Sequence, residues 1–196
     1  GVNDTVVNSF GNRSGSLQLE FLANPARIDP FATTTGFRVP FEALTLNGPG
    51  VNGIHANPKT MGIPGTTVVG ALNNLTGFNT WSQDITLWSG NSAVNFDLLY
   101  WDWGTVGIGA ERDTQLTITG NIKDDRLTGT TEFTDIEYSL IKTRPGRVIF
   151  VSANPYRGRT EILEGYLNIR DSRALGATGL EENGTYVFPG GTLELE

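Results

Sequence analysis

Short apolar runs separated by turn residues dominate the chain, and this pattern is clearest between Arg147 and Ala177. Proline and glycine divide the runs there, because a locked or a permissive backbone interrupts a strand. Each run is about four residues long, so no single hairpin could bury a core of its own. We expect the core to form by stacking successive coils of strand and turn. The strands expected in the last third of the chain cover residues 148–151, 160–163, 166–169, 185–188 and 192–195.

The spacing of similar positions supports stacked coils. Val148 and Leu167 are 19 residues apart, and Leu167 and Val187 are 20 apart, close to the interval of about 20 at which solenoid repeats begin. Tight Asn-Gly or Asp-Gly hairpins between obvious strand pairs are missing. These observations favour an all-β fold, a parallel β-helix (β-solenoid). An antiparallel β-sandwich is the alternative, since it also has short strands at regular spacing.

The middle of the chain contains two further expected strands. Residues 80–87, TWSQDITL, form one strand in which Trp81, Ile85 and Leu87 are apolar. Plain alternation from Gln115 onward places the side chains of Leu116, Ile118 and Ile122 on the buried side of another. Helical periodicity is absent throughout.

Two segments interrupt this style and are predicted to be insertions in a single domain covering residues 1–196. The first, residues 53–66, is rich in glycine and proline. The second, residues 88–112, contains a concentration of large aromatic and aliphatic side chains that its flanks lack. Both are expected to lie outside the regular coils.

The two ends of the chain resemble each other. Residues 15–20, GSLQLE, match residues 191–196, GTLELE, and residues 3–7 match residues 183–187. We therefore expect residues 1–20 and 181–196 to be equivalent coils of a longer repeat. Tandem repetition or strand addition would then join copies into a fibre, with Leu17, Leu19, Leu193 and Leu195 as the residues of self-association.

Composition excludes several classes of function. The chain has no cysteine and a single histidine, which removes disulfides, thiolate metal sites and multi-histidine metal sites. The net charge of −7 and the scattered basic residues argue against a nucleic-acid partner. No apolar run is long enough to span a membrane. Neither a metal nor a cofactor is expected.

A family resemblance rests on residues 140–148, LIKTRPGRV, followed by a pattern of Asn154, Tyr156, Gly158, Thr160, Ile162, Gly165 and Leu167. With residues 174–176 and 190–193, this pattern resembles the autotransporter-associated (passenger-associated) β-strand repeat of bacterial surface proteins. Pro155, Arg157 and Arg159 depart from the residues usual in that repeat. The resemblance implies a right-handed parallel β-helix located outside the cell. It implies no catalytic residues.

The second predicted insertion carries the only candidate ligand site. In a strand, Trp101 and Trp103 point to one face, with Tyr100 and Asp102 opposite and Asp97 nearby. Such a group could stack a sugar ring or anchor a partner protein. The alternative, which we favour, is that the rings cap the interior of the β-helix or cover its flank. The other acidic pairs, Glu111 with Asp113 and Asp124 with Asp125, are expected to be solvated surface charges.

The sequence therefore predicts a structural or adhesive repeat unit of an extracellular bacterial surface protein or fibre. The expected partners are other copies or tandem repeats, surface glycans, or proteins of a host or a neighbouring cell. An enzyme is not expected. The alternative is a carbohydrate-binding or carbohydrate-active β-helix module that uses the aromatic and acidic group at residues 96–103.

Overall fold

Three parallel β-sheets make up the computed structural model, which describes residues 5–7, 15–21, 35–48, 50, 69–87, 105–124, 138–179 and 183–196. The first sheet holds β1 (Thr5–Val7), β4 (Leu44–Leu46), β7 (Ile85–Leu87) and β10 (Ile122–Asp124). The second holds β2 (Leu17–Glu20), β5 (Leu72–Thr76), β8 (Thr105–Ala110), β11 (Ser139–Thr143), β13 (Thr160–Ile162) and β15 (Thr185–Val187). The third holds β3 (Arg38–Val39), β6 (Phe78–Trp81), β9 (Gln115–Ile118), β12 (Arg147–Phe150), β14 (Gly165–Ile169) and β16 (Gly191–Leu195).

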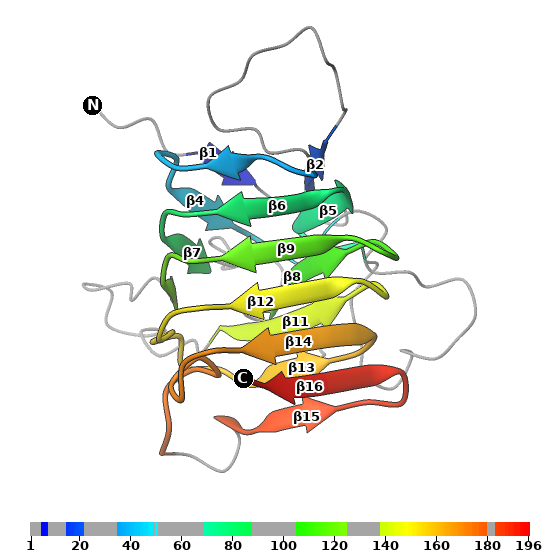
Figure 1. Cartoon of the computed structure of the whole chain (residues 1–196). Coiled ribbons are helices and arrows are strands. Elements are labelled where there is room, and N and C mark those ends of the chain that lie inside the picture. The colour runs from blue at the N-terminus through cyan, green and yellow to red at the C-terminus, as the bar shows by residue number, and fades with distance from the viewer. Residues whose placement is uncertain are drawn as a thin grey trace, which may run out of the picture.

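The chain visits these sheets in a fixed order. From β1 to β12 it passes from the first sheet to the second and then to the third, four times in succession. The last four strands, β13 to β16, alternate between the second and third sheets. In Figure 1, strands of the third sheet follow one another from β6 near the top to β16 at the bottom, beside the C-terminus.

Every named strand pairing in the described residues is parallel. The antiparallel β-sandwich is therefore wrong for this part of the chain. The predicted all-β character is confirmed, because no α-helix occurs among the described elements.

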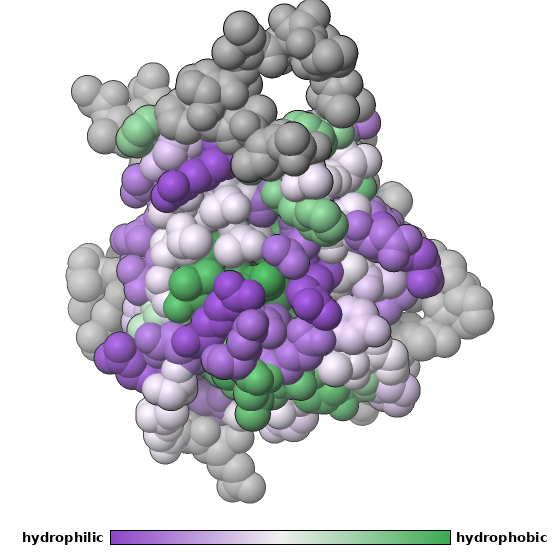
Figure 2. Space-filling view, viewed as in Figure 1, coloured by the Kyte–Doolittle hydropathy of each residue, from purple (hydrophilic) through white to green (hydrophobic). Residues whose placement is uncertain are grey.

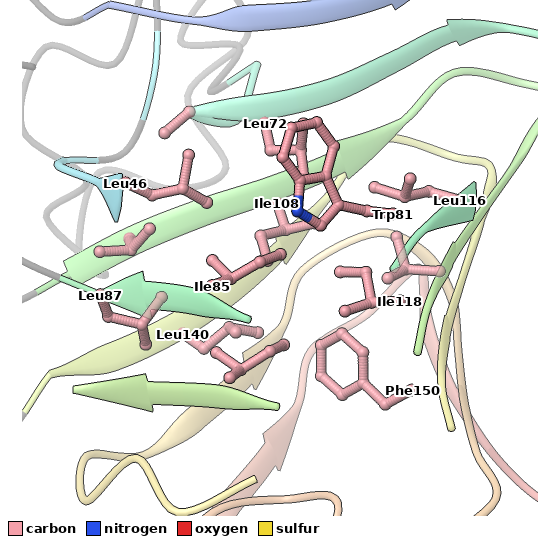
Figure 3. Packing of buried hydrophobic residues seen from close by; sticks show 14 of the residues in the cluster. Leu46, Leu72, Trp81, Ile85, Leu87, Ile108, Leu116, Ile118, Leu140 and Phe150 are labelled. Carbon is pink, nitrogen blue, oxygen red and sulfur yellow. The ribbon is translucent and has the colours of Figure 1, made fainter. Parts of the chain in front are cut away.

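Aligned rows of apolar side chains form the core between the sheets. In the third sheet, register pairing joins Trp81, Ile118 and Phe150 in one row, which continues through Ile169 to Leu195. In the second sheet, one row runs through Leu17, Leu72, Ile108, Lys142, Ile162 and Val187. Figure 3 shows side chains from all three sheets meeting in this interior, including Leu87, Ile108 and Phe150. Each coil is thus buried by its neighbours.

Close stacking of the coils requires glycine at certain turns. A Cβ atom added to Gly158 would lie 2.4 Å from the carbonyl carbon of Tyr138 in the preceding coil. Gly158 also donates its backbone N–H to the Tyr138 carbonyl oxygen, at 3.1 Å. Only a residue without a side chain permits this approach.

Most predicted strands of the last third are confirmed, within about one residue at their ends. The spacing of 19 is also confirmed, because Val148 and Leu167 are register partners. The spacing of 20 is wrong, since Val187 pairs with Ile162 in the second sheet and Leu167 pairs with Leu193 in the third. An interval of about 20 residues between two apolar positions does not show whether both lie in the same sheet, because each coil passes through more than one sheet.

The predicted strand over residues 80–87 is divided in two. It comprises the end of β6 and all of β7, which belong to different sheets. Trp81, Ile85 and Leu87 are nonetheless all buried. The break at residues 82–84 turns the chain while keeping these apolar side chains in the interior, which is why one apolar run became two strands.

The second predicted insertion extends too far. Residues 105–110 form β8, which pairs on both sides within the second sheet. Val106 and Ile108 are fully buried there, so this part belongs to the regular coils. Residues 88–104 and the first predicted insertion, residues 53–66, lie outside the described residues.

The two ends do not occupy matching places in the sheets. β1 and β2 belong to the first and second sheets, whereas β15 and β16 belong to the second and third. The similar sequences GSLQLE and GTLELE therefore lie one sheet apart. Alternating leucine and polar residues suit any of the sheets, so this local similarity does not identify which one.

Candidate functional site

The predicted aromatic site cannot be placed. Asp97, Tyr100, Trp101, Asp102 and Trp103 all lie outside the described residues. The prediction that they bind a sugar or a protein partner stays a prediction. His55 also lies outside the described residues.

Within the described residues, the feature that most resembles an interaction site is the pair of strands β15 and β16, which we call the C-terminal edge. Among the described strands, β15 pairs only with β13 and β16 only with β14. Their side chains continue the interior rows, but Val187 is 50% exposed and Leu195 is 76% exposed. Figure 2 shows apolar surface at this lower end of the molecule. An exposed strand edge beside exposed apolar side chains is a suitable place for another strand to pair.

The four leucines predicted for self-association have different environments. Leu193 and Leu195 lie in β16, where Leu193 is half-buried and Leu195 is exposed. Leu17 and Leu19 lie in β2 at the opposite end of the second sheet, where Leu17 is half-buried and Leu19 is buried. The structure does not bring the two pairs together within one chain.

Charged groups flank the C-terminal edge on the outer face of the third sheet. Arg147 donates to Glu194 at 3.0 Å, and its guanidinium lies 5.4 Å from the centre of the Tyr166 ring. Arg170 pairs with Glu196 at 2.9 Å. The Arg170–Glu196 pair joins neighbouring coils, whereas the Arg147–Glu194 pair reaches from β12 across β14 to β16. The outer face therefore carries both signs of charge around an exposed aromatic ring. Such partly exposed pairs add little stability individually.

Lys142 is the most unusual charged residue in the interior. It occupies the apolar row between Ile108 and Ile162 and is fully buried. Its Nζ atom donates to the carbonyl oxygens of Thr143 at 3.0 Å and Glu164 at 2.7 Å, and also to that of Arg144. These three acceptors match the three N–H groups of an ammonium group. Lys142 therefore ties the turn after β11 to the turn between β13 and β14.

Burial lowers the pKa of Lys142 to about 7, while the negative charges of Glu164 and Glu111 oppose this shift. The neighbouring Arg144 sits at a turn with a φ of 68°. Its Nε lies 3.1 Å from Glu111 Oε1, which also accepts from the side-chain amide of Asn73 at 3.2 Å. A lysine with this pKa is a feature of many active sites, but here its donors all point to backbone carbonyls. The arrangement is that of a structural clamp.

Buried asparagines join the coils in the same manner. Asn79 donates from Nδ2 to Asn74 Oδ1 at 2.7 Å, and Asn74 donates to the carbonyls of Gly77 and Gln115 at 2.9 and 3.2 Å. The first two bonds close the turn between β5 and β6, and the bond to Gln115 connects that turn to the adjacent coil. They satisfy backbone groups that would otherwise be buried without a partner.

Asn154 connects three successive levels of the fold. Its Oδ1 accepts from the backbone N–H of Ile122 at 2.7 Å, and its Nδ2 donates to the carbonyl of Ala174 at 2.8 Å. Its own backbone N–H donates to Arg173 at 3.0 Å. Nearby, the Tyr156 hydroxyl bonds to Thr160, and burial raises the pKa of that hydroxyl well above its usual range.

Two acidic side chains are shielded from solvent beside arginines. Asp124 was expected to be solvated, but its side chain is only 7% exposed and accepts from Arg157 Nε at 2.6 Å. Glu161 is buried with Arg159 at 2.8 Å. Burial raises the pKa of Glu161, and the charge of Arg159 opposes that rise. Both arginines come from the segment where the chain departs from the family pattern.

Sequence reasoning missed Lys142, and only a weak signal was present. Leu140 and Lys142 are two residues apart in a strand, so their side chains share a face. The apolar Ile141 between them is also buried, so alternation alone did not show which face lies inside.

No cluster of His, Asp or Glu suitable for a metal ion occurs within the described ranges. Within the same ranges there is no helix long and apolar enough to cross a membrane. Comparison of the chain with protein-family models, with curated proteins and with solved structures finds no match.

Proposed function

We propose that the chain is a right-handed parallel β-helix and serves as a structural or adhesive repeat unit of an extracellular bacterial surface protein or fibre. One observation carries this proposal: the chain passes through three parallel sheets in a repeated order, and interior rows run in register through as many as six strands. A coil of this kind is extended by adding further coils, each of which contacts only its neighbours. That property suits a stalk or a fibre.

The interior polar groups support a structural role. Lys142 donates to the Glu164 carbonyl in the next coil, and Asn154 binds the Ile122 N–H and the Ala174 carbonyl in the coils on either side. Asp124 pairs with Arg157 from the next coil, whereas Glu161 pairs with Arg159 within its own coil. The bonds of Lys142, Asn154 and Asp124 between coils hold one coil on the next.

The extracellular location is supported by composition and by the resemblance to passenger-associated repeats. A chain of 196 residues without cysteine avoids thiol chemistry in an oxidising environment. The exposed C-terminal edge supports self-association as the mode of assembly, with glycans or proteins of neighbouring cells as further partners.

Antibody labelling of the source cells tests the location. Antibodies raised against the purified chain are applied to intact and to permeabilised cells, with an antibody against a cytoplasmic protein as the control. We expect equal labelling of both samples by the first antibody and labelling of permeabilised cells alone by the control. Labelling that requires permeabilisation would contradict the proposal.

A further inference from the structure

We propose that copies of this chain associate head to tail in one register, with β15 and β16 of one copy pairing in parallel with β2 and β3 of the next. This inference rests on the proposed β-helix, because it requires the second and third sheets to continue across the junction. It specifies the partner of the C-terminal edge as a second copy, and it specifies the strands and residues that meet.

The first argument is that two interior rows stop while still apolar. Ile162 and Ile169 are buried, but the residues that follow them in their rows, Val187 and Leu195, are half exposed or more. At about 25 cal/mol per Å² of apolar surface, covering such side chains with another coil is favourable. In the part of the chain that the structure describes, no strand covers them.

The second argument is that the same two rows begin with partly buried apolar residues at the other end. The row that ends at Val187 starts at Leu17 in β2, and the row that ends at Leu195 starts at Val39 in β3. Leu17 and Val39 pack against the core from this end. Stacking a second copy in register therefore places Leu17 beside Val187 and Val39 beside Leu195.

The third argument is charge complementarity on the outer face. The row next to Leu195 runs from Arg38 through Thr80, Thr117, Ile149 and Asn168 to Glu194. The same register brings the exposed Arg38 of the next copy beside Glu194, which already pairs with Arg147 on its other side. Opposite charges at adjacent positions of neighbouring strands are favourable.

A two-fold contact between C-terminal edges does not meet these conditions. A two-fold axis runs paired strands antiparallel and places Glu194 near its own symmetry mate. If the two-fold axis places the third sheet of one copy against the third sheet of the other, the second sheet of each copy lies opposite the first sheet of its partner. The first sheet ends at β10, so it offers no strand at this end for the second sheet to pair with. Head-to-tail stacking alone continues both six-stranded sheets. Because this contact joins different surfaces without closing a ring, it produces a filament.

Sedimentation velocity over a range of concentrations tests the contact. We expect the mass of the wild-type chain to rise above 21.2 kDa with concentration. Val187→Lys and Leu195→Lys should each raise the concentration at which half of the chains are associated by at least tenfold. Phe78→Lys is the matched control, because Phe78 is 51% exposed on the outer face of the third sheet, and it should behave as wild type. A wild type that stays monomeric at all concentrations would overturn the proposal.

Cysteine crosslinking tests the register, and the absence of native cysteine makes it unambiguous. Chains carrying Leu195→Cys and chains carrying Val39→Cys are oxidised separately and as a mixture. We expect a disulfide dimer only in the mixture, and none when Leu195→Cys is mixed with Thr117→Cys from the middle of the sheet. A dimer of Leu195→Cys alone would show a two-fold contact and overturn the head-to-tail register.

These measurements use the purified chain and are independent of where the protein is located. A monomer found on the cell surface would remove the stacking and leave the location intact. A filament found inside cells would support the stacking of copies and contradict the extracellular location.

Discussion

Ile162 and Val187 are register partners in adjacent parallel strands of the second sheet, yet Ile162 is fully buried and Val187 is 50% exposed. Both side chains belong to the same interior row. The difference arises because β13 has a strand on each side, whereas β15 has a described neighbour only in β13. Burial in this fold therefore depends on the next coil as well as on the residue itself.

Truncating these two partners should have unequal effects on stability. We expect Ile162→Ala to lower the free energy of unfolding by about 2–5 kcal/mol, because it leaves a cavity in the packed row. Val187→Ala should cost less than about 1 kcal/mol at concentrations where the chain is monomeric. Urea unfolding followed by circular dichroism measures both. Equal losses would mean that β15 is covered in solution.

Asn154→Ala should destabilise the fold strongly. The substitution leaves the Ile122 N–H and the Ala174 carbonyl without their bonds to this side chain, and each unsatisfied buried group costs about 1–3 kcal/mol. Asn121→Ala is the control, because Asn121 is exposed and, among the described residues, its side chain bonds only to the Ala153 carbonyl at 2.5 Å. We expect urea midpoints to fall clearly for the first variant and little for the second. Similar midpoints would show that water replaces the bonds of Asn154.

Lys142 should make stability depend on pH above neutrality. Its pKa is about 7 in the folded chain and about 10.4 when unfolded. Between these values the unfolded chain binds one more proton, so the contribution of this residue to the free energy of unfolding rises with pH, by about 1.4 kcal/mol per unit at most. The charged groups around Lys142 are Glu164 and Glu111, which oppose the lowering of its pKa, and Arg144, which pairs with Glu111.

The measurement is urea unfolding at several pH values from 7 to 10. Lys142→Met keeps a similar side-chain length and has no titrating group, so its stability should rise less over this range than that of the wild type. Lys123→Met is the control, because within the described ranges Lys123 forms only an exposed pair with Asp84 at 3.1 Å. Parallel curves for the wild type and Lys142→Met would show that Lys142 keeps its proton in the folded chain.

The aromatic site remains a separate prediction. If residues 96–103 bind glycans, Trp101→Ala combined with Trp103→Ala should abolish binding on a glycan array while circular dichroism shows an intact fold, because the two large aromatic rings are the groups predicted to stack on the sugar. Tyr166→Ala is the control, because Tyr166 is an exposed aromatic residue outside that group. The absence of binding by the wild type, or equal binding by the double variant, would contradict the carbohydrate-binding alternative.

The sequence by itself determined the all-β class, most of the strands in the last third, and the burial of Leu116, Ile118 and Ile122. Short-range alternation and turn residues are sufficient for these predictions, because side-chain direction in a strand follows a period of two. The register between Val148 and Leu167 was also predictable, since both strands lie in consecutive coils of one sheet.

Only the tertiary structure decided which sheet each strand joins. GSLQLE and GTLELE satisfy the same local rules, but they lie in different sheets because the number of strands between them, and not their own sequence, sets their place in the winding. The same reason applies to the pair of Asp124 and Arg157, which are distant in sequence and meet through stacking of coils. Local pattern fixes which way a side chain points, whereas the stack of coils decides what it meets.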